Sequence, residues 1–336
     1  MYKNEELYPL ANLAQILKTS PEDLAEFAEK VQFTAITKVN SLDFIKKDDI
    51  ERFFEEYVLH SNITPRYWKI LPHLDNSVLP WATTLVKMYQ EKFAYPTCVS
   101  PSQGQLLKEL VSNINPQNIL EIGCFIGIST IWMAAGLEEI ESKAIIHSVD
   151  LFEPILLWTG YNYGYLNNPL EYAKNAALSA QLSHRISFYK MSSEELGKKF
   201  SQFIDRPIDF LYIDGDHSVP GCVNDFVLFY PQVPIGGYIM LHDIYPKFCG
   251  YEGPRYIIDN FIKKSPHFDL VEINTTPHNF GIALIRKRSE DKNLYPGKNW
   301  RLELHRARIR LSKTTTWKKI KDKPMGNLVR KVIRRI

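Results

Sequence analysis

The chain has 336 residues, 45% of them hydrophobic, which is enough for one large domain with an appendage or for two domains. Its 41 basic and 38 acidic side chains give a net charge of +3, and this small total conceals an asymmetry between the two ends. No apolar run reaches the roughly 18 residues of a membrane-spanning helix, and the first residues lack the apolar core of a signal peptide. The four cysteines show neither C-x-x-C spacing nor a metal-finger pattern. We therefore expect a cytoplasmic protein with free thiols.

The first 60 residues are expected to form a small helical module. Apolar residues recur at helical spacing over 10–17, and Ser20 is typical of the cap that opens a second helix. A β ribbon at 33–39 and a third helix from 47 to 57 follow. This order resembles, in pattern only, the winged helix of excisionase-type DNA-binding modules.

The charge of this module argues against DNA binding. Residues 1–60 carry seven basic and twelve acidic side chains, a net charge of −5. The helix that would enter the DNA carries four of the acids: Glu22, Asp23, Glu26 and Glu29. Because nonspecific DNA affinity comes mainly from neutralised phosphates, this face would repel DNA. We expect no nucleic-acid partner and interpret the module as a packing or dimerisation unit of a possible homo-oligomer.

Residues 61–94 are expected to form a linker and helical cover that leads into the main domain. The stretch is punctuated by prolines, and its Trp68 and Trp81 are interpreted as structural. We place the main domain at residues 95–286 and a separate tail at 287–336.

The most informative stretch is NILEIGCFIGISTIWMAAG, residues 118–136. A short apolar run predicts a buried strand, Gly123 and Gly127 lie in the following loop, and Ser129 opens a segment with helical spacing. A strand, glycine loop and helix in this order are typical of a nucleotide-type site at the carboxyl end of a parallel strand. The glycine spacing fits neither the three-glycine dinucleotide fingerprint nor a P-loop. A buried acid at Glu121 would repel a pyrophosphate, but it suits the ammonium or sulfonium of S-adenosylmethionine.

The pattern E-I-G-x-x-x-G-x-S-T in this stretch resembles motif I of class I S-adenosylmethionine-dependent methyltransferases. It is most similar to the small-molecule O-methyltransferase branch related to catechol-type enzymes. Residues 97–107 resemble the helix that precedes motif I in the same branch. The resemblance implies an α/β fold with a doubly wound, mostly parallel, Rossmann-like sheet. It also implies S-adenosyl-L-methionine as the cofactor, with contacts from Glu121, Gly123, Gly127 and Ser129.

Two further strands are expected to contribute to the cofactor site. A strand at 144–149 ends in Asp150, which is well placed to accept the ribose hydroxyls, although a simple strand-ending turn is the alternative. Ser192 follows a strand at 186–190, where members of the resembled family contact adenine. Between them, residues 158–168 (WTGYNYGYLNN) are expected either to line an acceptor pocket or to cover the sheet.

Polar side chains cluster where two later strands end. Residues 208–213 form an apolar strand followed by DGDHS, which contains Asp214 and His217. A strand at 238–241 is followed directly by His242 and Asp243. The carboxyl ends of neighbouring parallel strands share one edge of a sheet, so we expect these side chains to lie together, beside Glu121 and Asp150.

The resemblance implies a metal at this cluster. Metal-dependent relatives carry D-x-x-K after the fourth strand and D-N or D-D after the fifth, and their acids bind Mg²⁺. Asp214 matches the first acid, His217 replaces the lysine, and His242 with Asp243 matches the later pair. A histidine at 242 weakens the case for Mg²⁺, which prefers oxygen, so a softer divalent ion or no metal is also compatible. DGDHS together with HD resembles a bacterial subgroup of less characterised class I methyltransferases.

A mechanism follows from these residues. A histidine has an ordinary pKa of about 6.5, so it can take the proton of a phenol with a pKa near 10. An aliphatic hydroxyl needs a metal to lower its pKa first. We predict that His217 is the general base. Asp214 and Asp243 are predicted to be catalytic carboxylates that hold a divalent cation together with His242. Each histidine alternatively serves only as a strand-end residue hydrogen-bonded to a carboxylate.

The tail is strongly basic. From residue 298 it carries 14 basic and two acidic side chains, a net charge of +12. Leu328, Val332 and Ile336 share one helical face flanked by basic residues. Such a helix is compatible with peripheral binding to an anionic membrane surface or with an acidic partner.

The sequence as a whole predicts transfer of a methyl group from S-adenosylmethionine to a hydroxyl of a small molecule or sugar. Two alternatives stay open: a ligand-sensing regulator with a DNA-binding winged helix, and a hydroxylase-like or N-methylating relative on the same fold. The acidic recognition helix and the full set of strand-end acids weigh against the regulator.

Overall fold

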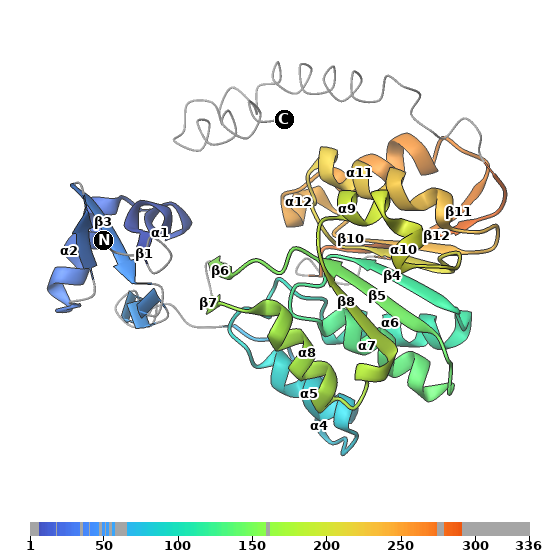
Figure 1. Ribbon diagram of the computed structural model, residues 1–336, viewed down its shortest axis with the longest axis horizontal. Coiled ribbons are helices and arrows are strands. Elements are labelled where there is room, and N and C mark those ends of the chain that lie inside the picture. Colours follow the sequence, from blue (N-terminus) through green and yellow to red (C-terminus); the bar gives the residue numbers. More distant parts are fainter. Residues whose placement is uncertain are drawn as a thin grey trace.

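The main body of the molecule is built on one seven-stranded sheet (Figure 1). The computed structural model describes residues 7–17, 19–33, 36–39, 41–46, 49–50, 52–53, 56–57, 66–158, 162–273 and 279–290. The strands lie in the order β11 (Phe268–Ile273), β12 (Ile282–Lys287), β10 (Tyr238–His242), β9 (Phe210–Ile213), β4 (Asn118–Ile122), β5 (Ile145–Asp150) and β8 (Ile186–Lys190). Only β12 among them runs antiparallel to its two neighbours.

The central strands are short apolar runs because helices cover both faces of the sheet. Every residue of β4 and β9 is buried, as expected of parallel strands that pack on both sides. One face packs against α5 (Pro80–Tyr89), α6 (Pro101–Ile114), α7 (Ile128–Glu139) and α8 (Pro169–Ser179), and the other against α9 (Ser193–Lys198), α11 (Val219–Phe229) and α13 (Gly253–Ile257). Shorter segments join them: α4 (Pro72–Asp75), α10 (Phe200–Phe203), α12 (Pro246–Cys249), 3₁₀ turns at Ser183–Arg185 and Tyr230–Gln232, and a π-helix at Ile258–Ile262. The predicted doubly wound α/β fold is confirmed.

Residues 7–57 form a separate small module with its own core. Three antiparallel strands lie in the order β1 (Leu7–Pro9), β3 (Leu42–Lys46) and β2 (Ile36–Val39), beside α1 (Leu10–Leu17) and α2 (Pro21–Lys30). The predicted cap at Ser20 is present as a reciprocal capping box with Asp23, so α2 begins where the sequence indicates. The first short strand was not predicted, since three residues carry too little periodicity to detect.

The aromatic insertion folds as a hairpin that reaches this module. Strands β6 (Ile155–Trp158) and β7 (Tyr163–Leu166) pair antiparallel and extend from the main body toward residues 7–57 (Figure 1). Leu156 and Tyr165 of the hairpin pack against the core of the small module. In the connection between the two strands, the buried Asn162 accepts a hydrogen bond from the Arg66 backbone N–H at 2.8 Å. The hairpin therefore contacts both the main body and the small module. The sequence suggested either an acceptor-pocket lining or a cover for the sheet, and neither interpretation included this contact.

The cysteines, the membrane-spanning potential and the basic tail were also addressed by the sequence. Cys98, Cys124, Cys222 and Cys249 are free thiols, as predicted. Among the helices that the structure describes, none has the length and apolar character needed to cross a bilayer. From residue 291 on, the basic tail lies outside the described residues, so its predicted membrane or acidic partner stays a prediction.

Helices α6 and α7 approach each other closely because glycines lie at their contact. A Cβ added at Gly104 would lie 2.0 Å from Nε1 of Trp132, and one added at Gly136 would lie 2.5 Å from the backbone oxygen of Lys108. Both distances are far below any real contact, so only glycine permits this separation. The close approach matters because α6 and α7 each deliver residues to the site described next.

We predict that Gly136→Ala destabilises the fold by about 1 to 3 kcal/mol, because its Cβ meets backbone that cannot rotate away. Urea unfolding measures the change. Gly197→Ala is the matched control, since it also lies in a helix but meets only the Cδ2 of Leu228 at 2.9 Å, at the end of a flexible side chain. Equal stabilities for the two variants would contradict a packing limit at the α6–α7 contact.

Candidate active site

The candidate site lies where the strand order of the sheet reverses. Strand β4 pairs with β5 on one side and with β9 on the other, so the chain moves outward in both directions from the β4–β9 pair. Ligands of open α/β sheets bind outside the carboxyl ends of the strands at such a point. Ile122 and Ile213 end the two strands in register, so the loops that begin at Gly123 and Asp214 start side by side.

The two loops touch through a position that only glycine can occupy. Gly123 has a φ of +90°, and a Cβ there would lie 2.1 Å from the backbone oxygen of Asp214. Gly127 closes the loop, also at φ +90°, directly before α7. Both glycines predicted from the sequence are therefore favoured by backbone conformation, and Gly123 is also required by close approach. They bring the loop after β4 against the acidic end of β9.

Asp150, the predicted ribose acceptor, holds this glycine loop in place. Its Oδ2 accepts the backbone N–H groups of Cys124 and Phe125, each at 2.9 Å. Its Oδ1 accepts the N–H of Phe152 at 2.8 Å. The side chain is half-buried at the carboxyl end of β5. The ribose contact stays a prediction, and the structure adds a loop-holding role that the sequence did not reveal.

Glu121 is fully buried beneath the loop, at 0% exposure. Its carboxylate accepts hydrogen bonds at 2.5 Å from three hydroxyls, those of Ser129, Thr130 and Ser148. Burial raises the pKa of Glu121 to about 7, against the opposing effect of the hydroxyls. The acid thus ties β4 to β5 and to the first turn of α7. The structure shows Glu121 and Ser129 hydrogen-bonded to each other. Direct cofactor contacts from these two residues stay predictions.

Ser192 lies beyond the carboxyl end of β8, as the sequence predicts, and begins α9. Its side-chain oxygen accepts the backbone N–H of Glu195 at 3.1 Å, which makes it the N-cap of the helix. An adenine contact at this position stays a prediction.

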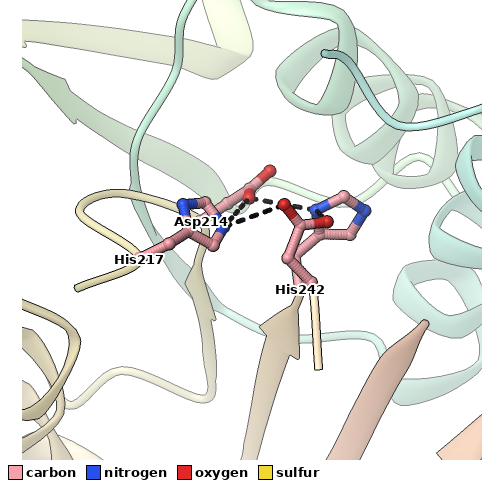
Figure 2. A group of neighbouring side chains, drawn as sticks. Asp214, His217 and His242 are labelled. Atoms are coloured by element: carbon pink, nitrogen blue, oxygen red, sulfur yellow. Dashed lines mark hydrogen bonds and ion pairs between the residues drawn. The ribbon is translucent and has the colours of Figure 1, made fainter. Parts of the chain in front are cut away.

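The ends of β9 and β10 bring together the four side chains expected there (Figure 2). Oδ1 of Asp214 lies 3.1 Å from Nδ1 of His242 and 3.2 Å from Nε2 of His217. The carboxylate of Asp243 lies 2.9 Å from Nδ1 of His242 and 3.3 Å from Nε2 of His217. Each histidine therefore faces both carboxylates.

Attraction between the histidines and the carboxylates determines which groups of this cluster are charged. Burial opposes the charged form of each histidine, but the carboxylates of Asp214 and Asp243 outweigh it and raise the pKa of His217, and that of His242 well above 6.5. Burial also opposes ionisation of Asp214, yet the two histidines hold its pKa below the ordinary range. Without a cation, the cluster is therefore a set of buried ion pairs.

The donor set fits a divalent cation. The four possible ligand atoms of Asp214, His217, His242 and Asp243 all lie within 4.8 Å of one another. Within the described part of the chain, Oδ1 of Asp243 and Nε2 of His217 are buried atoms that make no hydrogen bond, although each lies near an opposite charge. Buried polar atoms without hydrogen bonds are uncommon and point to a missing ligand. Asp243 also adopts a left-handed φ of +57°, a conformation uncommon for non-glycine residues but well tolerated by aspartate.

Two further residues complete the site, and neither was predicted from the sequence. Tyr212, fully buried in β9, donates its hydroxyl to Oδ2 of Asp214 at 3.0 Å. Gln103, in the first turn of α6, lies with its Oε1 3.3 Å from Nε2 of His242. No sequence signal could place Gln103 here, because its position depends on how α6 packs.

Comparison with known families fits this geometry. Residues 120–244 match the family model described as a methyltransferase domain, and residues 79–153 match the one described as an O-methyltransferase. The chain is an S-adenosylmethionine-dependent methyltransferase. The first match spans the loop after β4 and the acid–histidine cluster, and it includes all the predicted site residues.

Solved structures also resemble this methyltransferase. An O-methyltransferase from Bacillus cereus, solved in complex with SAH, is 20% identical, with 64% of this chain and 96% of that chain covered and a TM-score of 0.48. The O-methyltransferase TomG from Streptomyces achromogenes, involved in tomaymycin synthesis and solved with SAM, is 17% identical, with 72% and 99% covered and a TM-score of 0.47. No curated protein matches the chain.

We predict that Asp150→Asn weakens binding of S-adenosylmethionine at least about tenfold. The amide has one acceptor oxygen and would present its NH₂ group to a backbone N–H, at a cost of about 1 to 3 kcal/mol to the loop. Titration calorimetry measures the affinity. Glu153→Gln, three residues along and exposed, is the matched control and should bind like the wild type.

We also predict that the cation-free protein loses stability as the pH rises above 6.5. The raised pKa values of His217 and His242 mean that the folded state binds more protons than the unfolded chain in this range, so the free energy of unfolding falls with pH. A divalent cation that replaces these protons should reduce the fall. Thermal unfolding across pH, with chelator or with cation, tests this.

The double variant His217→Gln/His242→Gln should flatten the pH dependence, while His184→Gln, on an exposed histidine, should not. A wild-type protein whose stability rises over this range would refute the assignment of the ion pairs.

Proposed function

We propose that this methyltransferase transfers the methyl group of S-adenosylmethionine to a hydroxyl of a small molecule or sugar, with His217 as the general base. One observation carries the proposal: the glycine loop and the acid–histidine cluster are in direct contact, through Gly123 and the Asp214 backbone. A cofactor seated at the loop would therefore lie beside the groups that can take up a proton. Such adjacency is what an acceptor and a methyl donor require for reaction.

The cofactor would be held at the carboxyl ends of β4, β5 and β8. Gly123 and Gly127 allow a ligand to approach the backbone, Asp150 offers a carboxylate for the ribose, and Ser192 lies where adenine is expected. Glu121 and Ser129 support the loop from below. When bound, S-adenosylmethionine supplies a methyl group on a good leaving group, so the chain itself has only to orient the acceptor and remove its proton.

His217 is the residue best placed to remove that proton. Its side chain retains 18% exposure, whereas that of His242 retains 5%. The carboxylates of Asp214 and Asp243 orient its ring and stabilise the imidazolium that forms when it takes up a proton. Its raised pKa makes it a stronger base toward a phenol once it has lost its own proton, which a cation bound by the two carboxylates would favour.

Asp214, His242 and Asp243 would hold a divalent cation. Their donor atoms converge, and the buried Oδ1 of Asp243 has no hydrogen bond in the described part of the chain. A cation bound there would lower the pKa of a nearby hydroxyl and would extend the acceptors from phenols to aliphatic and sugar hydroxyls.

We predict that His217→Gln lowers kcat by about 10² to 10⁴-fold, the usual contribution of a general base, while affinity for S-adenosylmethionine is unchanged. Formation of S-adenosylhomocysteine with a panel of phenols and sugars measures turnover, and calorimetry measures affinity. His184→Gln is the control. Wild-type turnover by His217→Gln would remove this residue from the mechanism, and failure of the wild type to bind the cofactor would refute the proposed reaction.

A further inference from the structure

Gln103 is buried at 2% exposure, and its amide orientation is fixed from two sides. Its Nε2 donates to the backbone oxygen of Asn279 at 2.6 Å. Its Oε1 accepts the backbone N–H of Ser100 at 3.3 Å. A carbonyl can only accept and an amide N–H can only donate, so the two contacts together determine which end of the side chain is oxygen.

This orientation determines how His242 presents its ring. Oε1 of Gln103 lies 3.3 Å from Nε2 of His242, and an amide oxygen can only accept. Nε2 must therefore carry a hydrogen and donate it to Gln103. The other nitrogen, Nδ1, faces Asp214 at 3.1 Å and Asp243 at 2.9 Å. Nδ1 is thus the nitrogen whose lone pair is available to a cation between the two carboxylates.

We propose that Gln103 is a positioning residue that holds His242 as an Nδ1 ligand, and that the cluster therefore binds a divalent transition-metal ion in preference to Mg²⁺. The inference rests on the cation of the proposed function and specifies its chemical class. Imidazole nitrogen suits zinc, cobalt, nickel and iron, whereas Mg²⁺ demands oxygen ligands. A metal-bound histidine generally donates its other ring N–H to a partner that fixes the tautomer and the orientation of the ring. Gln103 would be that partner for His242.

The chemistry of a glutamine suits this position. Its neutral oxygen accepts from Nε2 without adding a third negative charge beside Asp214 and Asp243. Its NH₂ group also satisfies the buried oxygen of Asn279, which a carboxylate could not do. The contact draws together α6, β10 and the segment before β12, so the ring of His242 is fixed by parts of the chain far apart in sequence.

The test is metal binding by the full-length protein after removal of bound metals. Titration with Co²⁺, followed by its visible absorption, should show a nitrogen-ligated site, and Zn²⁺ should displace the Co²⁺. Mg²⁺ should compete at least about tenfold more weakly than Zn²⁺. Gln103→Met should weaken Co²⁺ binding by about 10 to 100-fold and change the absorption spectrum, because the ring loses its outer partner.

Two control variants separate this role from general structural effects. Gln105→Met makes the same replacement two residues along α6, where the side chain bonds to Glu109 instead of the site. Ser100→Ala removes the hydroxyl half of the reciprocal cap of α6 but keeps the backbone N–H that donates to Gln103 and should leave the Gln103–His242 contact in place. Both should bind Co²⁺ like the wild type.

Nitrogen NMR of the zinc-loaded, ¹⁵N-histidine-labelled protein gives a direct second readout. His242 should be metal-bound at Nδ1 and protonated at Nε2. Coordination through Nε2, no preference of the wild type for Zn²⁺ over Mg²⁺, or unchanged Co²⁺ affinity in Gln103→Met would each overturn the inference. Affinity for S-adenosylmethionine is measured on the same samples. It tests the cofactor binding on which the proposed function depends, so a failure of the proposed function can be told apart from a failure of the metal preference.

Discussion

The absence of a side chain at Gly123 is the constraint on which the site depends. The carboxyl ends of β4 and β9 meet at the centre of the sheet, and the loops that follow them pass so closely that any Cβ would overlap the Asp214 backbone. That contact joins two halves of the molecule with different tasks. The half from β4 through β8 builds a cradle of backbone and hydroxyl groups, and the half from β9 onward supplies charged side chains.

The two halves bury their acids by opposite means. Glu121 is hydrogen-bonded by three neutral hydroxyls, and its pKa is raised to about 7. Asp214 faces two histidines, which favour its ionised form. A fully hydroxyl-bonded carboxyl fixes the loop rigidly, whereas a carboxylate paired with titratable rings can exchange those partners for a cation or a proton. The β9–β10 edge is therefore where we propose that the chemistry takes place.

Much of this architecture could be predicted from the sequence, and the limits have physical reasons. Strands β4, β5, β8, β9 and β10 were found within one or two residues, because short apolar runs are the signature of strands covered on both faces. The acid–histidine cluster was predicted because strand ends must share an edge. The contact of Gln103 with His242 was not, since it depends on the separation of α6 and α7 that Gly104 and Gly136 allow. The hydroxyl partner of Glu121 on β5, Ser148, was missed for a different reason: it depends on strand register, which periodicity alone does not encode.

The β6–β7 hairpin has a consequence for how the chain matures during synthesis. Leu156 and Tyr165 pack against the core of the module formed by residues 7–57, although they are translated long after it. While the ribosome adds the intervening segment, that module lacks two of its apolar contacts and keeps the corresponding surface open to solvent. Domains generally fold as units in the order in which they emerge. Here the first unit to emerge gains two of its apolar contacts only when the later hairpin has been made.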